Sequence, residues 1–257
     1  MIVSLQQLVV FVLIISRLAG VFLQAPIFNS RSFPGTAKTA FAIWLSILLW
    51  FVTPISQNLP EALPLLILSI VFEVAIGFTI GFIINIIFLA VQAAGEIMDM
   101  QMGLSVATAL DPVFGAVISV IGRLAFFTAI IIFISADGHH IVLAGFHQSF
   151  TALPVGKLAN FSSPGLAMQI IELGSALFFT AIRLAAPIIL LIFLSDFTFG
   201  IVSRVAPQVN VFMLGFQVKP SLGMFGFLMA LPFIVKYISR LTEFMTEQLI
   251  LLANNIK

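Results

Sequence analysis

The chain has 257 residues, of which 61% are hydrophobic and 8% charged, with a formal net charge of +1 and a mean hydropathy of +1.22. A soluble domain has about 25% charged residues, so these proportions exclude a water-facing surface over most of the chain and indicate surrounding lipid or apolar protein. The small net charge excludes a basic surface for nucleic acid, and the absence of cysteine excludes disulfides and thiolate metal sites.

Apolar stretches interrupted by single charges, prolines and glycines predict an all-α membrane protein. Residues 1–15 lack a positive n-region and no cleavage site follows them, so we expect a retained first helix rather than a cleaved signal. Residues 39–60 and 74–95 are long enough to cross a bilayer core of about 30 Å. We expect one domain, residues 1–257, with kinked or broken helices at residues 1–23, 37–53, 59–100, 112–135, 138–152, 164–203 and 220–253.

Three short motifs predict where helices begin. In residues 58–61 an asparagine precedes Glu61 by three positions, which is the pattern of a capping box. Asp111-Pro112 and Ser163-Pro164 each place a capping residue before a proline, whose fixed φ suits the first turn of a helix.

The histidine pair His139-His140 is the main candidate for a metal site. Metal sites on helices favour ligands four residues apart, whereas adjacent side chains point about 100° apart, and His147 is further along the chain. We therefore expect a polar turn between two helices, with no metal and no cofactor.

No catalytic site is recognisable. Ser105 and Ser195 do not stand in a G-x-S-x-G elbow, and no histidine lies near either of them in the sequence to act as a base. We expect no enzyme, and an intramembrane hydrolase is a disfavoured alternative.

Charges within apolar helices are more informative, because one at a helix centre costs about 2.5–3.5 kcal/mol on insertion scales. They indicate an ion path or polar docking to partner subunits, or they lie at helix ends in water. The candidates are Glu73, Glu96, Asp99, Arg123, Arg183, Asp196 and Arg204. Gly77 and Gly81 form a GxxxG pattern, which favours close helix packing or arises by chance.

Small residues dominate residues 103–110 (GLSVATAL), which begin with glycine and lie between two apolar helices. Backbone that leaves helical geometry in a membrane protein is tolerated only where it is buried or lines a cavity. The segment is therefore a pore loop or plug, or else an ordinary connection.

Two longer motifs resemble those of a known family. Residues 93–112 (AAGEIMDMQMGLSVATALDP) are similar to the signature of FliR, an export-gate protein of the flagellum, whose injectisome relatives share the pattern more loosely. Residues 204–219 (RVAPQVNVFMLGFQVK) are similar to the family's second hallmark, R-x-x-P-Q-x-N-x-F. Further positions that fit the family are Arg17, Pro26, Glu73, Gly77, Gly81, Asp137 and Gly138.

The resemblance implies a structural, pore-forming component of the flagellar type III export gate in the bacterial inner membrane. Its helices and helical hairpins would pack with FliP and FliQ in a hetero-oligomer, with FlhB on the cytoplasmic side, lipid around it and unfolded flagellar proteins as cargo. The implied plug residues are Gly103, Leu104, Ser105, Val106, Leu110, Asp111 and Pro112. Residues expected to dock partners or to be buried polar groups are Glu73, Glu96, Arg204, Pro207, Gln208 and Asn210.

Two alternatives to this function stay open. One is an injectisome homologue of the same family. The other is a secondary transporter with a midplane site, which would need inverted repeats and paired broken helices; no internal repeat is visible in the sequence.

Overall fold

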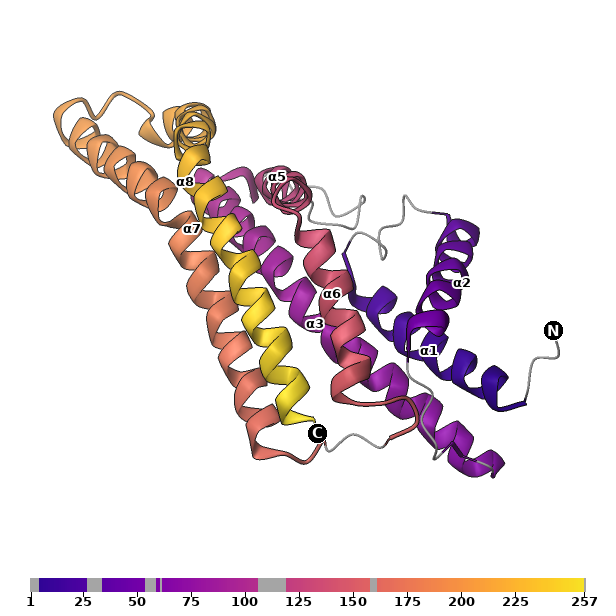
Figure 1. Ribbon diagram of the computed structural model, residues 1–257. Coiled ribbons are helices and arrows are strands. Elements are labelled where there is room, and N and C mark those ends of the chain that lie inside the picture. The colour runs from indigo at the N-terminus through magenta and orange to yellow at the C-terminus, as the bar shows by residue number, and fades with distance from the viewer. Residues whose placement is uncertain are drawn as a thin grey trace. The chain divides into compact units, whose positions relative to one another are not determined.

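The computed structural model describes residues 5–26, 34–53, 59–60, 62–105, 119–157 and 161–256. Every regular element in these ranges is helical (Figure 1): α1 (Leu5–Gln24), α2 (Gly35–Val52), α3 (Leu63–Met102), α5 (Val120–Ser135), α6 (Gly138–Ala152), α7 (Pro164–Val205) and α8 (Val211–Asn255). Among the described residues, 5 helices are long and apolar enough to cross a membrane, or 6 if α5 and α6 count as one broken span. The prediction of an all-α membrane protein is confirmed.

Most helix boundaries agree with the sequence, and α7 begins at Pro164 as predicted. The predicted start at residue 220 is wrong, because α8 begins at Val211 and contains both Pro220 and Pro232. The side chain of Asn210 accepts a hydrogen bond from the amide N–H of Met213 (3.1 Å), which caps the helix well before the first proline. The helix start predicted in residues 58–61 is wrong, because residues 59–60 lie outside any helix and α3 begins at Leu63. The start predicted at Asp111-Pro112 lies outside the described residues.

The chain forms two compact units, each assembled from segments that are distant in the sequence. Unit 1 comprises Met1–Ile87, Asp137–Gly174 and Thr242–Lys257, and unit 2 comprises Phe88–Ala136 and Ser175–Leu241. The helices α3, α7 and α8 each contribute to both units. The single domain of residues 1–257 stays a prediction.

Each unit has its own apolar core. In unit 1, α1 packs on the first half of α3, and Phe146 and Phe150 of α6 meet edge to face with ring centroids 5.1 Å apart. In unit 2, Phe88 of α3 meets Phe133 of α5 in the same way at 5.3 Å. Edge-to-face contact is the favoured geometry for apolar rings, so phenylalanine suits these water-free contacts.

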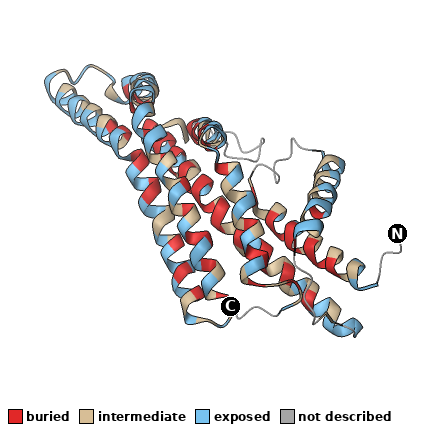
Figure 2. Ribbon diagram, in the orientation of Figure 1, coloured by how far each residue is buried: buried red, intermediate tan, exposed pale blue. Residues whose placement is uncertain are grey.

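Many large apolar side chains are exposed on the surface of the chain. Exposed positions run along α2, α7 and α8 (Figure 2), and Ser46 is the one residue of α2 that is buried. Phe178, Phe193, Phe197 and Phe212 are each more than 60% exposed. Faces of this kind mark contact with lipid or with other protein chains.

Candidate functional site

A fully buried ion pair lies in unit 1, between α1 and α3. Arg17 is 0% exposed and Glu73 is 1% exposed, and the Arg17 Nε donates to Glu73 Oε2 at 2.5 Å. The guanidinium also donates from Nη1 to the hydroxyl of Ser149 (3.2 Å) and from Nη2 to the carbonyl of Leu153 (3.0 Å). The second oxygen of Glu73 accepts from the amide N–H of Gly156 at 3.0 Å.

The charges and hydrogen-bonding groups of this Arg17 cluster (Arg17, Glu73, Ser149, Leu153 and Gly156) are therefore satisfied inside the chain. The guanidinium also lies 4.3 Å from the ring centroid of Phe150, a cation–π contact. Such pairs are tolerated in an apolar interior only when the remaining hydrogen-bonding groups are satisfied, as they are here. Glu73, one of the predicted docking or buried polar residues, is thus a buried residue whose partners come from α1 and from the turn after α6.

Glycines allow the close approach that this ion pair needs. A Cβ on Gly77 would collide with the main-chain carbonyl of Arg17, and one on Gly81 would lie 2.8 Å from the carbonyl oxygen of Val21. Gly20 faces α3 in the same manner. Of the two interpretations of the GxxxG pattern, close helix packing is the one that the structure supports.

In unit 2 a second buried carboxylate fixes the start of α5. Asp99 is 3% exposed, and its two oxygens lie 3.2 and 3.3 Å from the amide nitrogen of Ile121, which donates to them. A Cβ on Gly95 would lie 2.6 Å from the amide nitrogen of Gly122, so the two helices touch backbone to backbone. Glu96, which was predicted to dock a partner or to be a buried polar group, is exposed and accepts a hydrogen bond from Gln92 of its own helix.

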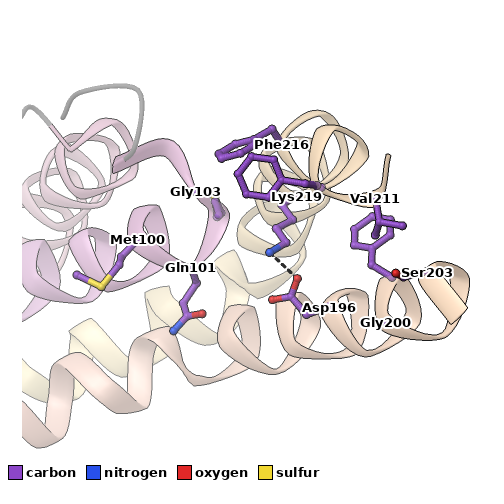
Figure 3. Close-up of a pocket in the computed structure, with 13 residues that line it drawn as sticks. Met100, Gln101, Gly103, Asp196, Gly200, Ser203, Val211, Phe216 and Lys219 are labelled. Carbon is purple, nitrogen blue, oxygen red and sulfur yellow. Dashed lines mark ion pairs between the residues drawn. The ribbon is translucent and has the colours of Figure 1, made fainter. Parts of the chain in front are cut away.

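The end of α3 borders a cavity of about 490 Å³ in unit 2 (Figure 3). Gly103 has a φ of +79°, a left-handed conformation that side chains resist, so the chain departs from α3 there. Leu104 and Ser105 follow and are half-buried. Across the cavity, Lys219 of α8 forms an ion pair with Asp196 of α7. The predicted plug residues Val106, Leu110, Asp111 and Pro112 lie outside the described residues.

The predicted docking motif begins in the last turn of α7, which contains Arg204, and continues through the turn between α7 and α8. Arg204, Pro207, Gln208 and Asn210 are all exposed, and the side chain of Asn210 caps α8. Within the part of the chain that the structure describes, no ion pair is found for Arg204. These four residues were predicted to dock partners or to be buried polar groups, and none of them is buried within the chain.

The histidine pair does not behave as adjacent positions on a regular helix would suggest. Asp137, His139 and His140 each offer a possible ligand atom, and these atoms all lie within 4.8 Å of one another. The two imidazole centroids are 4.1 Å apart. His139 and His140 therefore do not point too far apart to approach one ion, contrary to the prediction from their adjacent positions.

Similarity to known proteins indicates the family to which the chain belongs. Residues 8–245 match the family model described as bacterial export proteins, family 1. The chain is 32% identical over 212 residues to the flagellar biosynthetic protein FliR of Bacillus subtilis, covering 81% of each chain. The chain belongs to the FliR family. Its identity to FliR of Escherichia coli K12 is 29% over 229 residues, and that to FliR of Pectobacterium carotovorum is 29% over 225 residues, each covering 88% of this chain and 85% of the relative.

Membership of the FliR family makes the chain a membrane component of the flagellar export apparatus. The role named for the family is protein export, and the FliR relatives are named for flagellar biosynthesis. The three FliR relatives are flagellar proteins, which favours the flagellar system over the injectisome.

Proposed function

We propose that the chain is a pore-forming component of the flagellar export gate in the bacterial inner membrane. There it assembles with FliP and FliQ, contacts FlhB, and takes part in passing unfolded flagellar proteins across the membrane. The observation that carries the proposal is the FliR-family match over residues 8–245 in a chain whose long helices expose apolar faces. Apolar faces of this extent need either lipid or partner subunits as cover.

The exposed α7–α8 turn is proposed as a docking site for an adjacent gate subunit. Arg204 carries a charge amid exposed apolar neighbours such as Val205 and Ile201. A carboxylate or carbonyl on a partner would compensate that charge at the moment of assembly. Gln208 offers an exposed amide close by in the sequence.

We expect Arg204→Ala to lower the yield of the complex with FliP and FliQ while leaving the fold of the chain itself unchanged, because Arg204 is exposed in the chain. The measurement is co-purification from membranes after co-expression, with the expression level of the chain determined in parallel. Arg240→Ala is the matched control, since Arg240 is also exposed but lies outside the motif. Equal complex yields for Arg204→Ala, Arg240→Ala and the parent would show that the turn does not dock a subunit.

The segment after α3, residues 103–112, is proposed as the plug of the resting pore. The left-handed Gly103 supports this proposal, because it ends α3 and lets the chain turn away from the helix axis. Leu104, Val106 and Leu110 would fill a narrow pore and exclude water and ions by dewetting. Small side chains between them lose little contact area when the plug moves.

We expect shortening of residues 103–110 to leave assembly largely intact but to make the resting gate leak ions and small solutes. Entry of a small dye or osmolyte into cells that express the assembled complex measures the leak. A full-length control with Leu104, Val106 and Leu110 all changed to serine separates loss of the apolar seal from loss of length, and it should leak as well. A shortened gate that assembles and stays as tight as the parent would make the segment a simple connection.

A further inference from the structure

The start of α6 brings together three potential metal ligands from four consecutive residues, with Asp137 at the N-cap and His139 and His140 in the first turn of the helix. Asp137, His139 and His140 bring their ligand atoms within 4.8 Å of one another. The imidazoles of His139 and His140 lie side by side, with an angle of 38° between their planes. All three residues belong to unit 1, so the geometry of the cluster is set within one compact unit.

Asp137, the first residue of this cluster, has an unusual backbone conformation. It has a φ of +56° and is the one non-glycine residue with positive φ in the described ranges. An aspartate at the N-cap ordinarily accepts a hydrogen bond from the first turn of the helix, but the Asp137 side chain makes no such bond to α6. Its carboxylate instead faces His140, with 3.4 Å between Asp137 Oδ1 and His140 Nδ1.

That separation fits two ligands of one ion better than it fits a hydrogen bond. Good N–H···O bonds are about 2.7–3.2 Å long. Two ligand atoms at about 2.0–2.1 Å from a tetrahedral zinc ion lie roughly 3.3 Å apart. The 3.4 Å between Asp137 Oδ1 and His140 Nδ1 therefore needs little adjustment to accept the ion, and rotation of a ring can bring in the third ligand.

His139 supplies an independent indication of a missing partner. Its Nδ1 is buried, and no described residue forms a hydrogen bond with it. A buried nitrogen left unpaired costs about 1–3 kcal/mol, and almost all such atoms in proteins have a partner. A ligand at this turn would remove that cost, either by binding Nδ1 or by reorienting the ring.

We propose that Asp137, His139 and His140 bind a divalent transition-metal ion of the zinc class. Two imidazoles with one carboxylate suit Zn²⁺, Ni²⁺ and Cu²⁺ rather than Mg²⁺ or Ca²⁺. The side chains of Asp137 and His140 are 76% and 68% exposed, which leaves the remaining coordination positions to water. The bound ion holds the strained turn at Asp137 and fixes the first turn of α6.

The test uses the full-length chain in detergent, together with any membrane subunits that co-purify with it and with affinity tags removed so that tag histidines add no site. Titration with Co²⁺ is followed by its visible absorption, and Zn²⁺ is then added as a competitor. We expect one Co²⁺ per chain, displaced by Zn²⁺. Asp137→Asn, His139→Ala and His140→Ala should each weaken binding by at least about tenfold, the loss that even outer-shell changes around a metal cause.

His147→Ala is the matched control, because His147 lies on the same helix two turns further on, and it should bind Co²⁺ like the parent. Because Asp137 and His140 are exposed, substituting either of them should leave the fold intact. The melting temperature of each variant tests this expectation. Absence of Co²⁺ absorption in the folded parent, or equal binding by the His139→Ala/His140→Ala double variant, would overturn the proposal. The readout is spectroscopic and does not depend on any role in export.

Discussion

Arg17→Ala is expected to destabilise unit 1 more than any other single change in the described part of the chain. The substitution leaves the carboxylate of Glu73 charged, buried and without its cation. Breaking a buried pair by removing one partner costs about 3–5 kcal/mol. At about 2–4 °C per kcal/mol for a chain of this size, the melting temperature should fall by roughly 6–20 °C. Thermal melting of the detergent-solubilised chain or complex measures the effect.

Two further variants show whether the loss comes from the unpaired charge. Glu73→Gln should be almost as damaging, because it leaves the Arg17 guanidinium without its anion. Arg17→Met with Glu73→Leu removes both charges and should recover part of the stability, since apolar replacements of buried pairs are often neutral or better. Arg123→Ala removes an exposed arginine and should change little. A double variant as unstable as the single ones would trace the loss to packing rather than to charge.

Gly77→Ala is the second change for which we expect a large effect. It should lower the stability, although the same change elsewhere in a helix raises it. Alanine normally favours a helix over glycine by about 1 kcal/mol. At Gly77 the new methyl group would collide with the Arg17 carbonyl, and main-chain atoms cannot move aside as a flexible side chain does. Overpacking of this kind costs about 1–3 kcal/mol or more, so the melting temperature should fall.

Gly174→Ala is the matched control for Gly77→Ala. Gly174 lies inside α7, and no described atom would come within 4 Å of a Cβ placed on it. The substitution should therefore raise the stability slightly, by about 0.5–1 kcal/mol. If both variants shift the melting temperature in the same direction, the contact between α1 and α3 is looser than the glycines suggest.

Local signals predicted the helices well, because each signal acts over a few residues. Ser163-Pro164 starts α7 where the fixed φ of proline is useful. The start of α8 was missed because Pro220 was taken as a helix start, although Asn210 caps the helix earlier and the long helix tolerates both of its prolines. A proline therefore marks a boundary only when the flanking residues also favour one.

The contacts that define the candidate site could not be predicted in this way. Glu73 lies 56 positions from Arg17 and Ser149 lies 132 positions from it, so only the packed helices bring them together. The one usable sequence signal was complementarity, since a lone arginine and a lone glutamate in apolar helices each need an opposite charge. The histidine pair was misjudged because sequence position gives only the direction in which each side chain leaves the helix, whereas the imidazoles of His139 and His140, both in the first turn of α6, lie with their centroids 4.1 Å apart.

Because the residues of the Arg17 cluster are far apart in the sequence, they also become available at different times during biosynthesis. Ser149 is translated 132 residues after Arg17, which takes about 7–26 s at the usual 5–20 residues per second. During that interval α1 has already left the ribosome while its arginine lacks part of its final environment, a state that costs up to about 2.5–3.5 kcal/mol in a bilayer. The first helix should therefore stay at the insertion machinery or the membrane surface until α3 arrives. It should reach its final packing only after α6 has also been inserted.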